Sequence, residues 1–299
     1  MNLLDVLIST AIFTTAVVPM LYLAATGQRL ARMTPEAIDL HQRVRVVSDM
    51  LQRDIAMAGA GPLHGSLAGR LGALVPPIVP ARTGARSPDP ELSAFFDRIS
   101  VITVPDGATE SALMTSMMRP FDGLRLDPAA QGCSPSGLCG FTEGTRALVI
   151  DPRGAGFGYD LFTVTSATTE LAHDAPNPGF SKAYPVDALV VPIVQRVYSF
   201  DRLNRRIVLY DGYQSEMPLI DNVLNLTFEY FGDAAAGGLQ RLPLTQLSDG
   251  PATGISPHTF DRDLLRVRLV HVTLRLGSFD GVPDYEVAFD VKLRNMVRE

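Results

Sequence analysis

Histidines and acids are the residues of this chain that could do acid–base or metal chemistry, and they are scattered. The five histidines stand at positions 41, 64, 173, 258 and 271. His271 could belong to a catalytic group, but with no partner nearby in the sequence an exposed strand-face histidine is the simpler interpretation. Asp261 with Asp263, or the stretch around Asp174, could hold calcium, yet neither has the ligand number of an EF-hand loop. We predict no catalytic residue and no metal site.

Sequence motifs of the common cofactor sites are missing. The sequence holds no P-loop, no HExxH, no G-x-S-x-G and no dinucleotide fingerprint. The run GAGFG, Gly154 to Gly158, shares only its glycine content with a phosphate loop, and a plain turn is the better interpretation. A formal charge of −6 without a long run of either sign argues against a nucleic-acid partner. We therefore expect neither an enzyme nor a cofactor.

Two cysteines, Cys133 and Cys139, lie close together in QGCSPSGLCGF with turn-forming residues between them. This spacing suits a disulfide in an oxidising compartment. Two free thiols are the alternative. A zinc site is a weaker one, because such sites usually need four ligands and no histidine lies beside these cysteines.

One acid, Asp5, interrupts an otherwise apolar run, MNLLDVLISTAIFTTAVVPMLYLAATGQR. Leu3 to Ala25 supplies the roughly 20 apolar residues that a membrane-spanning helix needs, and Pro19 should kink it. A carboxylate in a bilayer costs on the order of 2.5–3.5 kcal/mol, so Asp5 needs a compensating partner, or it simply reaches the headgroups. Nothing basic precedes the run, as a cleaved signal would require.

The segment after the apolar run is amphipathic. Gly59, Gly61 and Pro62 should end its helix, and Thr34 with Pro35 resembles an N-cap at which the helix breaks or restarts. The residues of its apolar stripe recur every three or four positions: Leu40, Val44, Val47, Leu51, Ile55 and Ala58. We expect this stripe to pack on the rest of the protein.

The remainder of the chain is typical of short strands and turns. Branched residues bounded by turn formers predict strands at 98–104, 146–151 and 160–166. The run 188–200 and the run 205–212 could pair through the turn 201–204, with Pro192 marking an edge or a bulge. Alternation predicts half-buried strands at 222–231 and 285–294, and a change of parity predicts a bulge near Leu269. Together these elements predict an α+β protein with one long helix on antiparallel sheet.

The start of the chain resembles a known family. LLDVLISTAIF is similar to the beginning of a mature type IV pilin or pseudopilin, in which a hydrophobic N-terminal helix carries an acid at position five. The resemblance implies that a prepilin peptidase removes a leader and methylates the new N-terminus, here Met1. It also implies that Asp5 meets the N-terminal amine of a neighbouring subunit in the filament core. This chain has Asp5 where the family usually has glutamate, and Met1 where it usually has phenylalanine.

A more particular resemblance is carried by RVRVVSDMLQRDIAMAGAGP. This helix and its Gly/Ala-rich end are similar to the minor pilins called PilW and to the J-type pseudopilins of type II secretion. RISVITVPDGA, GLCGF, PLIDNVLNLTFEYFGD and VKLRNM match more weakly, in the same order. The resemblance implies a minor pilin of a type IV pilus that primes or caps the filament, with a J-type minor pseudopilin as the alternative. An anchored envelope enzyme or binding module is the alternative from another class.

These expectations divide the chain into three parts. Residues 1–27 form the membrane or filament-core half of the helix, 28–60 its amphipathic half, and 61–299 a β-rich body outside the cytoplasm. Arg29 and Arg32 follow the span and by themselves would leave the body in the cytoplasm. A body in the cytoplasm conflicts with the expected disulfide, and a basic leader once present before Met1 would resolve this conflict.

The expected location is the inner membrane, by a single pass, and then a surface pilus or periplasmic pseudopilus. The expected partners are other pilins, the prepilin peptidase and, before assembly, the inner membrane.

Overall fold

The computed structural model describes residues 3–90, 92–128, 139–151, 159–174, 180, 182–234, 237–250, 261–277 and 284–295. Within the N-terminal helix the side chains of residues 3–9, 12, 16 and 29–37 lie outside this description. Met1 and Cys133, the side chain of Asp5 and the glycine run at 154–158 therefore lie outside the described residues.

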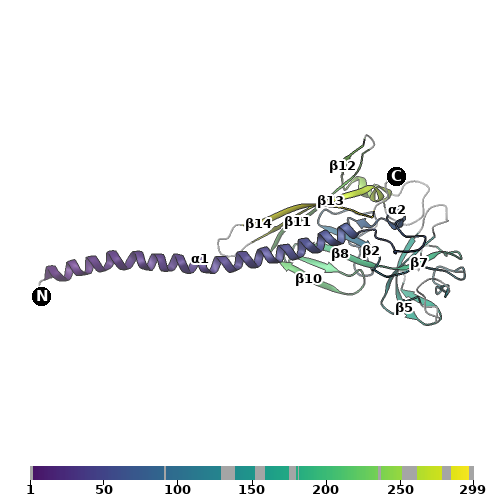
Figure 1. Ribbon diagram of the computed structural model, residues 1–299, viewed down its shortest axis with the longest axis horizontal. Coiled ribbons are helices and arrows are strands. Elements are labelled where there is room, and N and C mark those ends of the chain that lie inside the picture. Colours follow the sequence, from purple (N-terminus) through teal and green to yellow (C-terminus); the bar gives the residue numbers. More distant parts are fainter. Residues whose placement is uncertain are drawn as a thin grey trace.

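The first element is a single helix, α1 (Leu3–Met57), which extends from the body toward the N-terminus (Figure 1). It continues through Pro35, so the expected break there is wrong. The helix is followed by the short α2 (Leu71–Leu74) and, near the C-terminus, by two 3-10 turns at Gln246–Ser248 and Arg262–Arg266. Gly59 ends α1 in the left-handed region, with φ +72°, where a glycine is favoured.

Strands dominate the body and form three antiparallel sheets. The first sheet has the order β1-β2-β8-β9-β10: Ile78–Val79, Arg98–Thr103, Val194–Asp201, Arg206–Tyr210 and Glu216–Asp221. The second has the order β12-β11-β13-β14: Leu239–Leu242, Val223–Asp233, Val267–Leu276 and Tyr285–Lys292. The third has the order β3-β7-β4-β5-β6: Ser111–Ala112, Leu189–Pro192, Arg146–Ile150, Tyr159–Ala167 and Leu171–Asp174.

The predicted fold class is wrong. Among the described residues, strands account for 37% and helix for about 21%, so the protein is mostly β rather than an α+β protein built from one long helix on a sheet. The physical reason is that α1 contributes only its C-terminal part to the fold. The body forms its cores mainly by packing sheets, and it needs the helix to complete just one of them.

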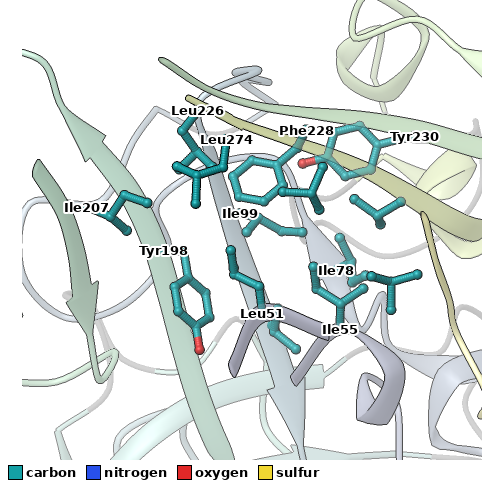
Figure 2. Close-up of a cluster of buried hydrophobic side chains, with 14 of the residues drawn as sticks. Leu51, Ile55, Ile78, Ile99, Tyr198, Ile207, Leu226, Phe228, Tyr230 and Leu274 are labelled. Atoms are coloured by element: carbon teal, nitrogen blue, oxygen red, sulfur yellow. The ribbon is translucent and has the colours of Figure 1, made fainter. Parts of the chain in front are cut away.

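The core that α1 completes is formed by the first two sheets together with the C-terminal half of the helix (Figure 2). Leu51 and Ile55 point from the helix toward Ile99 of β2 and Tyr198 of β8, and all four side chains are fully buried. The predicted stripe is confirmed, because Val44, Val47, Leu51, Ile55 and Ala58 are all buried. Leu40 packs against the same core.

Several strand predictions are also confirmed. Asp201 pairs with Arg206, which makes β8 and β9 the expected hairpin. The register between β11 and β13 shifts between the pairs Phe231–Leu269 and Gly232–Val267, where a bulge was predicted. The run 188–200 differs from the expectation: β7 ends at Pro192 and the chain passes into another sheet as β8.

Candidate functional site

The candidate site is the N-terminal half of α1, which carries large apolar side chains into solvent. The described side chains from Thr10 to Gln28 are exposed, apart from the half-buried Val17. Phe13 is 67% exposed and Tyr22 is 72% exposed. The other large apolar side chains exposed there are Val18, Met20, Leu21 and Leu23.

This apolar surface surrounds the helix. Met20, Leu21, Tyr22 and Leu23 are consecutive, and at about 3.6 residues per turn four consecutive side chains point in nearly all directions around the axis. A helix that is hydrophobic all round is normally buried among other elements. Figure 1 shows this half of α1 beyond the body, so no helix or strand of the described residues packs against it.

The prediction of a membrane span at Leu3–Ala25 is not supported. Among the residues whose side chains are described, no helix has an apolar stretch long enough to cross a membrane.

Pro19 lies inside α1, and helix continues on both sides of it. Close to it, the Thr14 and Thr15 hydroxyls donate to the carbonyls of Thr10 and Ala11, so these polar side chains satisfy hydrogen bonds within the helix itself. The kink at Pro19 stays a prediction, as does the assembly role of Asp5.

A buried polar contact fixes the other half of α1 to the body. Asp54 Oδ1 accepts a hydrogen bond from Arg196 Nη1 at 2.5 Å, and Asp54 Oδ2 accepts one from the Tyr198 hydroxyl. The hydrogen bond with Asp54 raises the pKa of Arg196. Burial, with the Asp54 charge as a second cause, raises the pKa of Tyr198. Tyr198 therefore stays protonated and keeps donating to Asp54.

Further hydrogen bonds hold the end of the helix. The amide of Gly59 donates to the carbonyl of Ile102 in β2 at 3.0 Å, and the amide of Arg294 donates to the carbonyl of Ala56 at 3.2 Å. The body thus clamps α1 from the first sheet and from the C-terminal segment. The axial position of the exposed half is set by these contacts.

The sequence analysis missed Asp54. A signal was available, because position 54 follows Leu51 by three residues and so lies on the buried stripe, where an acid needs a partner. The partners on β8 could not be found in the same way. Arg196 and Tyr198 lie more than 140 positions away along the chain, and only the fold brings them to the helix.

Two of the residues weighed for catalysis or metal binding, His271 and Asp261, make polar contacts within the fold. His271 Nδ1 lies 2.6 Å from Asp290 Oδ1 of the neighbouring strand, on a solvent-facing side of the second sheet. Asp261 caps the 3-10 turn that follows it, because its carboxylate accepts from the amide of Asp263. In the described part of the chain, no group of three or more His, Cys, Asp or Glu side chains could hold a metal ion.

Cys139 is buried and takes part in a disulfide. The other cysteine of the chain, Cys133, lies outside the described residues. The predicted pairing of these two residues therefore stays a prediction.

Comparison of the chain with protein-family models, curated proteins and solved structures returns no match.

Proposed function

We propose that this protein is a subunit of a helical filament, a minor pilin of the PilW type that primes or caps a type IV pilus. The observation that carries the proposal is the apolar half of α1, which is exposed on all sides while the other half is clamped to the body. In a filament core, the helices of neighbouring subunits would cover this surface.

The energetics favour such burial. Fully burying one large apolar side chain contributes about 1.5–3 kcal/mol, so the six exposed large side chains of the apolar half could together contribute on the order of 10 kcal/mol. That is as large as the net stability of a typical domain. Packing against other helices would thus provide a strong driving force for assembly.

The role proposed for Asp5 is selection of axial register. A carboxylate in an apolar helix bundle is costly unless a cation meets it, and an N-terminal ammonium of an adjacent subunit is the expected cation. Only one stagger between neighbouring helices brings the two charges together. The proposal also places the body outside the cytoplasmic membrane, where the predicted disulfide can form.

The test compares two helix acids in cells that assemble filaments. Asp5→Ala should leave the folded protein present at wild-type level but absent from sheared filaments. Asp49→Ala is the matched control, because Asp49 is an exposed acid on the body-proximal half of the same helix, 3.9 Å from Arg45, and its loss should leave incorporation unchanged. Incorporation of the Asp5→Ala protein at the level of the control would refute the register role.

A second measurement addresses processing. The mass of the N-terminal peptide, from protein purified out of its native envelope, should show N-methylation of Met1. An unmodified or formylated Met1 in filament-associated protein would contradict processing by a prepilin peptidase.

A further inference from the structure

The third sheet belongs to a lobe that is inserted into the first sheet. Strands β2 and β8 pair directly, with Ile102 opposite Gln195 and Thr103 opposite Val194. All strands of the third sheet come from the 90 or so residues between these two strands. Figure 1 shows β5 and β7 of this inserted lobe at the end of the molecule opposite the N-terminus of α1. The lobe and the body therefore meet at a seam beside the start of β8.

Arg146, the first residue of β4, bridges this seam. Its Nη1 donates to Thr163 Oγ1 of the lobe at 2.9 Å, and its Nη2 donates to Gln195 Oε1 of the body at 3.0 Å. Gln195 Nε2 in turn donates to Thr83 Oγ1 at 2.6 Å. Thr163 and Gln195 are both buried. Every side-chain partner of the guanidinium in this network is neutral.

The guanidinium also has an unused donor. Arg146 Nε is buried and has no hydrogen-bond partner among the described residues. No ion pair joins Arg146 to a carboxylate among the described residues, although Asp174 and Asp211 are close enough to affect its pKa. One oxygen of the Asp211 carboxylate is already engaged, because Oδ1 accepts from the amides of Tyr213, Gln214 and Ser215.

The Arg146 side chain is half-buried, but its Nε–H donor is fully buried. A buried donor without an acceptor often marks a missing water or ion. Burial lowers the pKa of Arg146, although the negative charges of Asp211 and Asp174 act in the opposite direction. An anion at the seam would supply an acceptor for Nε and a negative charge in direct contact with the guanidinium.

We propose that Arg146 is the centre of an oxyanion-binding site at the seam between the inserted lobe and the body, for a carboxylate or phosphate group. Arginine suits both groups, because its planar fork of N–H donors matches their oxygens. Interfaces between two parts of a fold are also a preferred place for ligand sites. A bound oxyanion would tie the lobe to the body. The inference is independent of filament assembly.

The experiment uses the full chain and two probes, inorganic phosphate and N-acetylglutamate, at constant ionic strength set with sodium chloride. Thermal unfolding midpoints and the NMR signal of the arginine Nε–H groups are followed through each titration. The wild type should show a saturable rise in the unfolding midpoint and a saturable shift of one Nε–H signal, with half-saturation on the order of 1 mM. A tenfold preference for one probe identifies which oxyanion the site takes.

Arg146→Gln should weaken both responses at least tenfold. Arg119→Gln is the matched control, since Arg119 is an exposed arginine of the same lobe, and it should behave like the wild type. If Arg146→Gln does not fold, Arg146→Lys keeps the charge and removes the Nε–H, and its loss of the response supports the site equally. The inference is overturned if the wild type shows no saturable response up to about 100 mM of either probe, or if Arg146→Gln responds as the wild type does.

Discussion

Removing the carboxylate of Asp54 should weaken the attachment of α1 to the body and so lower the free energy of unfolding. Asp54 is 7% exposed and accepts hydrogen bonds from both Arg196 and Tyr198. In Asp54→Ala the Tyr198 hydroxyl, which belongs to a fully buried side chain, loses its acceptor. A buried hydroxyl left without a partner costs about 1–3 kcal/mol.

The arginine contributes less to this loss. The Arg196 side chain is 42% exposed, so water can solvate its guanidinium once Asp54 is gone, and that half of the contact is worth only about 0–1 kcal/mol. The sum is a loss of about 1–4 kcal/mol in the free energy of unfolding, whereas breaking a fully buried ion pair costs about 3–5 kcal/mol. Asp54→Asn keeps the shape and one acceptor oxygen, and we expect it to lose about 1 kcal/mol.

The assay is urea unfolding of the full chain followed by far-UV circular dichroism, since the chain has no tryptophan. Asp49→Ala serves as the control, because Asp49 is an exposed acid on the same helix and should change the unfolding free energy by less than about 0.5 kcal/mol. If Asp54→Ala matches this control, the contact with Arg196 and Tyr198 does not hold the helix, and the reasoning fails.

Three further predictions concern acid, a tight turn and the exposed helix. Burial lowers the pKa of His173 below its ordinary value, so the neutral form is favoured in the folded state. The contribution of His173 to the free energy of unfolding should be fully present above about pH 6.5 and should fall as the pH drops further. In urea unfolding at pH 7.5 and 5.5, His173→Gln should reduce this fall. Gly59→Ala should lower the free energy of urea unfolding by about 1 kcal/mol more than Gly69→Ala does. Both glycines have positive φ, which costs alanine about 1–2 kcal/mol, but of the two only Gly59 would place a Cβ within 4 Å of other atoms, 3.1 Å from Cβ of Pro77. Equal losses in the two variants would contradict the crowding at Gly59. Leu21→Asp should leave the urea unfolding of the body unchanged yet abolish filament incorporation in sheared preparations. Leu203→Asp, on the fully exposed β8–β9 turn, should be incorporated normally. Incorporation of both variants would argue against burial of the apolar helix.

Local periodicity accounts for what the sequence alone could determine. The stripe through Val44, Val47, Leu51 and Ile55 repeats at helical spacing, and these residues are buried as expected. The change of parity near Leu269 marked a real shift in register. Such patterns are reliable because the side chains of a helix or strand alternate between core and solvent with a fixed period.

Tertiary structure decided which strands share a sheet. The run 188–200 reads as one strand in the sequence, but it is divided after Pro192 between the inserted lobe and the body. Pairing of β2 with β8 across the whole lobe is a contact between distant residues, and no local pattern encodes the partner of a strand. The predicted α+β class failed because the cores form mainly between paired sheets and α1 completes only one of them, which depends on pairings between distant strands.

For the charged residues too, the sequence predicts the element on which each lies, whereas the tertiary structure decides its partners. The sequence places Asp54 on a buried helix face and Arg146 at the start of a strand. Whether each charge gains a direct partner depends on distant segments: Asp54 accepts hydrogen bonds from Arg196 and Tyr198, whereas the side chains that Arg146 hydrogen-bonds in the described part of the chain are the neutral Thr163 and Gln195. Burial and pairing of a charge are properties of the packed chain, because they depend on the distance to groups that only folding brings near.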